Sequence, residues 1–216
     1  MYGGTFDPVH LGHLEIARSV LQLFEIEKVL FVPAQIAPHK IGRPVTQAIH
    51  RYAMLALATQ NDSQLSISTF ELDAPDRRYT VDTIEHFQRE LEDSTELFFI
   101  MGADSWTEIA TWREWERLLT ITNHIVVTRP GYELETSHVG ELRERIIDLR
   151  GEGSRPSGGG IFITDVVMND VSATNIRTLV SEGRTDRLAN YLPGPVLEYI
   201  KKYGIYRNSN EAKFNS

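Results

Sequence analysis

Two histidines, His10 and His13, lie three residues apart near the start of the chain, directly after the stretch GGTFDPV. Residues three apart in a helix share one face, so both imidazoles could reach the same ligand. Glycines let backbone N–H groups approach a phosphate closely, and the start of a helix offers unpaired N–H groups with partial positive charge. The stretch therefore predicts an anion-binding cradle for an oligophosphate.

The same two histidines allow a second interpretation, a zinc site. Two imidazoles at this spacing could bind zinc, but a zinc site needs a third ligand and often an oriented carboxylate. Asp7, Asp104 and His39 are the candidates for these roles. The zinc site stays open as an alternative.

The composition indicates one globular domain of a soluble protein. The chain has 216 residues, of which 41% are hydrophobic and 24% are charged. No apolar run approaches the ~18 residues of a membrane span, and residues 1–20 lack the pattern of a secretory signal. The chain has no cysteine, which excludes disulfides and thiolate metal sites. We therefore expect a cytoplasmic protein with no membrane partner.

The net charge of −8 argues against a nucleic-acid partner, because nucleic-acid-binding domains usually present a basic face. A small anionic ligand is still compatible with this charge if the local cations converge. The cations that could converge on one pocket are His10, His13, Lys40, Arg43, Arg129 and Arg177.

Helical and strand-like segments alternate along the chain. Helical spacing marks residues 13–24, 50–60, 79–92, 112–121, 171–183 and 196–206. Strand-like runs occupy residues 28–34, 65–72, 96–104, 124–132 and 160–167. This order predicts an α/β fold: a Rossmann-like, doubly wound, mainly parallel sheet with helices on both faces and a small C-terminal helical part.

We expect residues 1–207 to form a single domain. Residues 151–160 are rich in Gly, Ser and Pro, which predicts a flexible surface loop. The polar residues 208–216 predict a disordered tail. In an open parallel sheet, ligands bind beyond the carboxyl ends of the strands, and the opening motif lies at the first such place.

The string GGTFDPVHLGH, followed far along the chain by VSATNIR, resembles the nucleotidyltransferases of the HxGH type. In that family the first motif holds the triphosphate of ATP and the second caps it from another helix. Further stretches make the chain look most like the bacterial nicotinate mononucleotide adenylyltransferases. These stretches are VPAQIAPHK, RRYTVDT, FIMGADSWTEIATWREWERLL and YLPGPVLEYIKKYGIY, so that the resemblance runs from residue 2 to about residue 207.

The resemblance implies transfer of AMP from ATP to nicotinate mononucleotide, which gives nicotinate adenine dinucleotide and pyrophosphate in NAD biosynthesis. The attacking phosphate oxygen is already ionised at neutral pH, so no general base is needed. Catalysis then consists of aligning two anions and stabilising charge on the leaving pyrophosphate. Mg²⁺ is expected as the cofactor, bound mainly through the ATP phosphates. The oligomeric state stays open, with a homo-oligomer as one option.

The resemblance also assigns residues to the reaction. The expected catalytic residues are His10, His13, Lys40 and Arg177. The expected ATP-binding residues are Gly3, Gly4, Thr5, Phe6, His13, Gly102, Asp104, Arg129, Ser172, Thr174 and Arg177. Trp112 is expected to stack on the pyridine ring, and Thr80 to contribute to the same pocket.

One departure from the family concerns the first strand. Family members usually have a full strand before the two glycines, whereas only Met1 and Tyr2 precede Gly3 here. Either native residues are missing before Met1, or this edge of the site is built differently. Our hypothesis is a truncated strand at the centre of the sheet, and we expect it to lower the stability of the protein.

Three alternatives to this function stay open. The same chemistry could act on nicotinamide mononucleotide or on phosphopantetheine. A nucleotide-binding module without catalysis is a second alternative, although it would tolerate the loss of cations that this chain retains. A metal-dependent hydrolase using His10 and His13 is the third.

Overall fold

The computed structural model describes residues 1–35, 45–74, 78–92, 94–150, 158–165 and 171–207. The structural statements that follow concern these residues. The tail at 208–216 and residues 151–157 of the Gly-rich loop lie outside them, so both expectations stay predictions. Residues 158–160 of that loop form no helix or strand.

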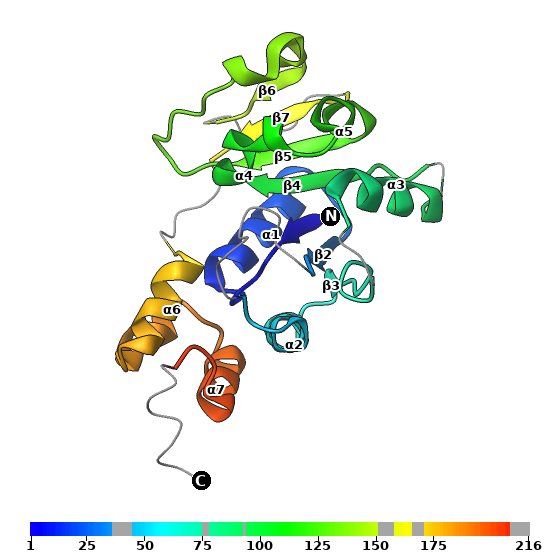
Figure 1. The fold of residues 1–216 in the computed structure, drawn as a ribbon. Helices are drawn as coiled ribbons and strands as arrows, with labels where there is room; N and C mark the ends of the chain where they lie inside the picture. Colours follow the sequence, from blue (N-terminus) through cyan, green and yellow to red (C-terminus); the bar gives the residue numbers. More distant parts are fainter. Residues whose placement is uncertain (36–44, 75–77, 93, 151–157, 166–170, 208–216) are drawn as a thin grey trace.

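One seven-stranded sheet forms the centre of the molecule (Figure 1). Its strands are β1 (Tyr2–Gly4), β2 (Val29–Pro33), β3 (Leu65–Ile67), β4 (Phe98–Gly102), β5 (Asn123–Val127), β6 (Ile146–Asp148) and β7 (Ile161–Thr164). Their order across the sheet is β3-β2-β1-β4-β5-β7-β6, and each described pair of neighbours is parallel. The Rossmann-like parallel sheet predicted from the sequence is confirmed.

Helices cover both faces of the sheet. The α-helices are α1 (Leu11–Leu23), α2 (Ala48–Thr59), α3 (Thr80–Glu90), α4 (Ala103–Thr107), α5 (Trp115–Ile121), α6 (Ala173–Ser181) and α7 (Gly194–Tyr203). Short 3-10 helices span Ile109–Thr111, Ser137–Arg145 and Thr185–Asn190. One buried core includes side chains of α1, α2, α6 and α7, and a second includes side chains of α3, α4 and α5. In Figure 1, α6 and α7 lie together beside α1 and α2, as the C-terminal helical part that the sequence predicts.

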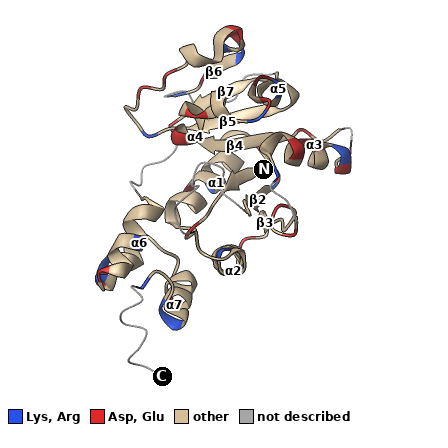
Figure 2. Cartoon of the chain, viewed as in Figure 1, with Lys and Arg blue, Asp and Glu red and all other residues tan. Residues whose placement is uncertain are grey.

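The strands alternate between these two cores because successive side chains of a strand point to opposite faces. Phe98 and Ile100 of β4 lie in the core with α1 and α7. Phe99 and Met101 lie in the core with α3 and α5. Figure 2 accordingly shows the sheet largely free of charged residues, which occur mainly on loops and helices such as α3, α6 and α7. The strands β2, β4 and β7 are mainly apolar because both faces of the sheet are covered there.

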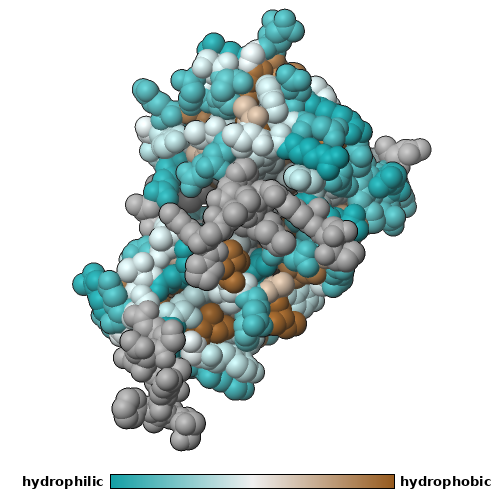
Figure 3. Space-filling model, viewed as in Figure 1, coloured by the Kyte–Doolittle hydropathy of each residue, from teal (hydrophilic) through white to brown (hydrophobic). Residues whose placement is uncertain are grey.

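The surface has the opposite character. The face in Figure 3 is mostly hydrophilic, with hydrophobic residues in separate patches. No helix among the described residues is long and apolar enough to cross a membrane.

Element boundaries differ from the predictions where the backbone turns. The predicted strand at 65–72 keeps only its first residues, because turns follow Ile67. The predicted helix at 112–121 begins at Trp115, since Glu114 has a left-handed backbone with φ of 51°. The strand β6 was not predicted at all: its sequence, IID, is too short to show alternation. The predicted helix at 171–183 is bounded by Ser172 as N-cap and by Gly183, whose φ is 73°.

The first strand lies at the centre of the sheet, as predicted. β1 pairs with β2 on one side and with β4 on the other. The chain winds outward from β1 to β3, then returns to place β4 on the opposite side. The sheet therefore has its topological switch point between β1 and β4, which is where ligands bind in folds of this kind. The lowered stability expected from the short strand stays a prediction.

A buried histidine in β5 predicts how stability depends on pH. His124 is fully buried, and burial lowers its pKa from 6.5 to about 3, with a further contribution from the charge of Arg145. Between about pH 6.5 and pH 3 the unfolded chain binds a proton at this site that the folded chain does not. We therefore expect the free energy of unfolding to decrease by about 2 kcal/mol from this residue alone when the pH falls from about 7.5 to about 5.

Urea unfolding at these two pH values checks this prediction. His124→Leu removes the titrating group. On acidification, the free energy of unfolding of this variant should therefore decrease by about 2 kcal/mol less than that of the wild type. An equal loss in both proteins would show that His124 does not control the acid sensitivity.

Candidate functional site

The opening motif occupies the loop between β1 and α1, at the switch point of the sheet. β1 ends at Gly4, α1 begins at Leu11, and the neighbouring strand β4 ends at Gly102. Because parallel strands all end at one edge, the motif and the residues after β4 share this edge. The predicted placement of the motif beyond the carboxyl end of a strand is confirmed.

His10 and His13 lie against one another at the start of α1. Their rings are stacked, with centroids 3.6 Å apart and an interplanar angle of 22°. The backbone N–H of His10 donates to Nδ1 of His13 over 3.2 Å. The edge of the Phe6 ring packs near His13, with centroids 5.0 Å apart. The two imidazoles thus share one face, as their spacing predicted.

The charge of His10 differs from the expectation. His10 is 6% exposed, and burial lowers its pKa from 6.5 to about 4. Its ring is therefore neutral near pH 7. Burial thus disfavours the charged form of His10, which the sequence predicted as one of a group of converging cations.

The two glycines of β1 leave room for aromatic rings. A Cβ atom at Gly3 would lie 2.9 Å from the ring of Phe99, and one at Gly4 would lie 2.9 Å from the ring of Phe6. Phe6 has a left-handed backbone with φ of 49° and is only 2% exposed. Its side chain is therefore part of the core, and only its backbone could meet a ligand. The sequence predicted Phe6 as an ATP-binding residue but did not distinguish its backbone from its side chain.

The start of α6 meets the opening loop, as the predicted pocket requires. A guanidinium N–H of Arg177 donates to the backbone carbonyl of Asp7 over 2.7 Å. A second N–H of Arg177 donates to Oγ1 of Thr174 over 3.1 Å. A Cβ atom at Gly12 of α1 would lie 3.7 Å from Val171. Segments from the two ends of the chain are thus adjacent, and Arg177 joins them.

Ser172 caps α6 at this junction. Its Oγ accepts a hydrogen bond from the backbone N–H of Asn175 over 3.3 Å. Ser172 is half-buried and Thr174 is exposed, so neither residue is fully buried. An N-cap serine satisfies one of the helix-terminal N–H groups and leaves others for an anion.

Asp7, the carboxylate within the opening motif, is engaged elsewhere. Its Oδ1 accepts from the hydroxyl of Tyr206 over 2.6 Å, and its Oδ2 accepts from the backbone N–H of Thr46 over 3.2 Å. Within the described ranges, no group of three His, Asp or Glu side chains could hold a metal ion. His39, the other proposed zinc ligand, lies outside the described residues. The geometry therefore gives the zinc interpretation no support.

The residues after β4 and β5 form the open side of this edge. A Cβ atom at Gly102 would meet no atom within 4 Å, which leaves space above the end of β4. Asp104 is exposed on α4, and Arg129 is exposed two residues after β5. All three lie at the carboxyl ends of neighbouring strands, as predicted for residues that contact a nucleoside.

The segment around Trp112 lies close to the start of α3. Trp112 is half-buried, and its ring packs near Phe99 with centroids 6.3 Å apart. The guanidinium of the next residue, Arg113, lies 4.8 Å above the ring of Tyr79. Thr80, which follows Tyr79, is the first residue of α3. The structure therefore brings the two predicted pyridine-binding residues into one region.

The other two tryptophans have structural roles. Trp106 is fully buried, and its indole N–H donates to the backbone carbonyl of Glu135 over 2.8 Å. Trp115 begins α5 and packs against the same core. Trp112 packs near Phe99, and its neighbour Arg113 contacts Tyr79 at the start of α3.

Two residues near the opening loop were missed from the sequence. Arg51 of α2 is 1% exposed and donates to the backbone carbonyl of Thr5, and Tyr206 donates to Asp7. A signal for Arg51 existed: together with Met54 and Leu55 it has the i, i+3, i+4 spacing of a buried helix face. No comparable signal marks Tyr206, because its contact joins residues 199 positions apart.

The remaining predicted residues cannot be placed. Lys40 and Arg43 lie in residues 36–44, outside the described part of the chain.

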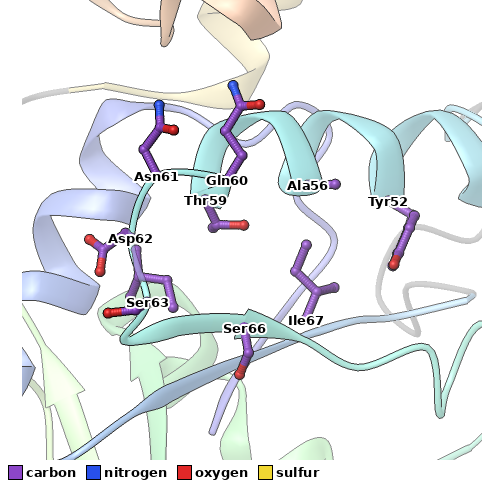
Figure 4. A pocket seen from close by; sticks show the side chains of 10 residues that line it. Tyr52, Ala56, Thr59, Gln60, Asn61, Asp62, Ser63, Ser66 and Ile67 are labelled. Atoms are coloured by element: carbon purple, nitrogen blue, oxygen red, sulfur yellow. The ribbon is translucent and has the colours of Figure 1, made fainter.

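The pocket in Figure 4 does not include any predicted site residue. It is an open hollow between α2 and the edge strand β3, and Tyr52, Thr59, Asp62 and Ser66 are among its lining residues.

Sequence comparisons find relatives over nearly the whole chain. The sequence profile described as "Cytidylyltransferase-like" matches residues 1–179. The "Probable nicotinate-nucleotide adenylyltransferase" of Thermoanaerobacter sp. (strain X514) is 40% identical over 209 residues, which cover 97% of this chain and 94% of that protein. A protein of the same name from Thermus thermophilus is 39% identical over 207 residues, covering 96% of this chain and 98% of its own.

Solved structures have the same fold. Nicotinic acid mononucleotide adenylyltransferase of Plasmodium falciparum complexed with NaAD aligns with a TM-score of 0.72 and 20% identity, covering 95% of each chain. The same protein complexed with APC aligns with a TM-score of 0.70 and 21% identity, over 95% of this chain and 94% of the other. At these identities the likeness concerns the fold.

Proposed function

The chain belongs to the cytidylyltransferase-like family, and we propose that it is the family's nicotinate-nucleotide adenylyltransferase, an enzyme of NAD biosynthesis. It transfers AMP from ATP to nicotinate mononucleotide and releases pyrophosphate and nicotinate adenine dinucleotide. A relative of this name shares 40% of its residues with it across 97% of the chain. The observation that carries the proposal is the junction at Asp7, where Arg177 of α6 reaches the loop that bears the two histidines.

The reaction requires positioned donors and no general base. An ionised phosphate oxygen of the mononucleotide attacks the α-phosphorus of ATP, and the bond from that phosphorus to the β-phosphate oxygen breaks. His13 accepts the backbone N–H of His10 at Nδ1, so that the neutral ring carries its proton on Nε2. In our proposal, Nε2–H donates to a phosphate oxygen near the reacting centre as charge moves toward pyrophosphate.

His10 has a different role in this proposal. Its neutral ring stacks on His13 and supports the orientation of that ring. Because the two planes are nearly parallel, rotation of either ring would lose contact with the other. His10 therefore positions its neighbour and can donate to a phosphate as a neutral group.

The start of α6 is proposed to bind the β- and γ-phosphates. Arg177 is already held by the carbonyl of Asp7 and the hydroxyl of Thr174, so little side-chain freedom is lost when a phosphate binds. The backbone N–H groups of the first turn add partial positive charge, and Ser172 and Thr174 add hydroxyl donors. Lys40 is assigned to the same phosphates through the resemblance alone.

A divalent metal ion is expected, as for nucleotidyltransferases in general, and we propose Mg²⁺. When bound, the ion would neutralise phosphate charge and favour release of pyrophosphate. Both carboxylate oxygens of Asp7 already accept hydrogen bonds, whereas Asp104 is exposed at the end of β4. The described residues contain no cluster of protein ligands for a metal, which fits an ion held mainly by ATP phosphates.

Trp112 is proposed to stack on the pyridine ring of the acceptor. Trp112→Ala should raise KM for nicotinate mononucleotide about tenfold, because a lost aromatic stack costs roughly 1 to 1.5 kcal/mol. KM for ATP should stay within about twofold of the wild type. Steady-state kinetics with each substrate varied in turn check this prediction.

Trp112→Phe is the matched control for that variant. It keeps a ring at the site and should retain most of the affinity for the acceptor. A similar rise of KM for both substrates in Trp112→Ala would instead point to a general disturbance of the fold.

The proposed function is tested by mixing the protein, Mg²⁺ and ATP with one acceptor at a time and following pyrophosphate. Nicotinate mononucleotide should be the best acceptor among nicotinate mononucleotide, nicotinamide mononucleotide and phosphopantetheine. Binding of ATP without release from any acceptor would favour the non-catalytic module. A preference for either other acceptor would keep the chemistry and change the substrate.

A further inference from the structure

Arg51 is an unusual arginine because its charged group is buried. It lies in the second turn of α2 and is 1% exposed. A buried guanidinium is costly unless its N–H groups are paired. Here its Nε donates to the carbonyl of Thr46 over 2.9 Å, and its two terminal nitrogens donate to the carbonyls of Thr5 over 2.8 Å and Gln35 over 3.1 Å.

These three carbonyls belong to the loops at the proposed active site. Thr5 directly follows β1 and precedes the motif that bears the histidines. Gln35 lies two residues after the end of β2, and Thr46 lies shortly before α2. Because β1 and β2 are parallel neighbours, both loops leave the sheet at the same edge. Arg51 of α2 therefore links Thr5 after β1 to Gln35 after β2 through hydrogen bonds to their carbonyl groups.

The hydrogen bond from Arg51 to Thr5 also fixes the direction of the next backbone N–H group, that of Phe6. The C=O of Thr5 and the N–H of Phe6 belong to one planar trans peptide and point in opposite directions. Since the carbonyl points at Arg51 in α2, the N–H is directed away from α2. The guanidinium thus sets the orientation of a peptide in the loop where phosphate-binding N–H groups are proposed.

Asp7 supplies the opposing charge. Burial lowers the pKa of Arg51, while the nearby carboxylate of Asp7 and the hydroxyl of Tyr206 act in the opposite direction. Asp7 is 4% exposed, and it is held by Tyr206 and by the N–H of Thr46. The buried charge is therefore balanced, and the same Thr46 contacts both partners.

We infer that Arg51 is a positioning residue for adenylyl transfer: it fixes Thr5 after β1 relative to Gln35 and Thr46, and so orients the phosphate-binding backbone of the opening loop. The inference rests on the proposed function. Arg51 touches neither substrate in this scheme and acts through backbone groups. Its removal should misplace the phosphate-binding loop, and a misplacement of about 1 Å can reduce the rate about 100-fold.

The test compares Arg51→Met with a control on the same buried face of α2. Met54 lies one turn further on and is fully buried in the hydrophobic core, so Met54→Ala lowers stability without removing a loop contact. We expect Arg51→Met to lower kcat/KM for ATP about 100-fold at a temperature where both variants are folded. Met54→Ala should keep kcat/KM within about threefold of the wild type, although its melting temperature falls.

Arg51→Lys keeps the charge but cannot reach three carbonyls at once. It should remain folded and should recover part of the rate, with kcat/KM about tenfold below the wild type. If Arg51→Met does not fold, this variant carries the test alone. A value of kcat/KM for Arg51→Lys equal to that of the wild type would then overturn the inference.

Hydrogen exchange supplies a readout besides activity. In Arg51→Met, a peptide covering residues 3–7 should exchange faster than in Met54→Ala under the same conditions. Equal exchange, or equal kcat/KM in the two variants, would overturn the inference. Absence of pyrophosphate release by the wild type would instead count against the proposed function, and the exchange comparison would still decide the role of Arg51.

Discussion

His13→Ala should lower kcat by about three orders of magnitude while the protein keeps its fold. The lost group is the Nε2–H donor, whose orientation is set by the hydrogen bond between His10 N and His13 Nδ1 over 3.2 Å. Removing one preorganised donor from developing negative charge costs about 100-fold to 1,000-fold in kcat. KM for ATP should change much less, because the contact strengthens as charge develops in the transition state.

Two further variants test whether the effect of His13→Ala comes from loss of the Nε2–H donor. His13→Gln places an amide N–H near the position of Nε2 and should recover roughly tenfold to thirtyfold of the lost rate. His50→Ala is the control: His50 bonds to Tyr199 over 2.9 Å on the α2 and α7 side and should leave kcat unchanged. Single-turnover measurements of pyrophosphate release, together with circular dichroism, check these values. Near-normal turnover of His13→Ala would show that the assignment is wrong.

Arg177→Ala should lower kcat/KM by about three orders of magnitude through loss of a fixed positive fork at the β- and γ-phosphates. Arginines that stabilise a transferring phosphoryl group contribute about 1,000-fold or more. The side chain also holds the carbonyl of Asp7 over 2.7 Å, so its loss should loosen the opening loop as well. Both effects act in the same direction on the rate.

Arg177→Lys distinguishes charge from geometry. A lysine keeps one positive charge but cannot contact a phosphate and the Asp7 carbonyl as a planar fork. We expect its kcat/KM to lie between those of the wild type and the alanine variant. Arg184, which pairs with Glu182 at the surface over 3.2 Å, provides the control, and Arg184→Ala should behave as the wild type. A loss of less than tenfold in Arg177→Ala would remove this residue from the phosphate site.

The fold class followed from periodicity because helices and strands repeat at different intervals along the chain. The switch point at β1 and β4 and the central place of the first strand agree with that prediction. Boundaries were less well predicted, since they depend on single residues. Glu114, for example, adopts a left-handed backbone that shortens α5 at its start.

For the candidate site, the spacing of the residues could be read from the sequence, whereas their burial could not be predicted from it. The shared face of His10 and His13 depends on three residues of helix, which the sequence contains in full. The neutral state of His10 depends on its burial in the folded protein, which no local pattern records. Phe6 shows the same limit, since its ring is buried against His13 and the glycine at position 4.

The sequence by itself determined the α/β fold class and the local spacing of the motif, and it predicted an anion cradle after the first strand. The second phosphate site at the start of α6 and the aromatic side chain for the acceptor are predictions from the resemblance. The tertiary structure alone decided how these parts are held, through Arg51 beneath the loops and Tyr206 on Asp7. The physical reason is distance along the chain. Contacts between residues 46 and 199 positions apart form only when the sheet and its helices pack, whereas motif spacing is set by the local geometry of one helix.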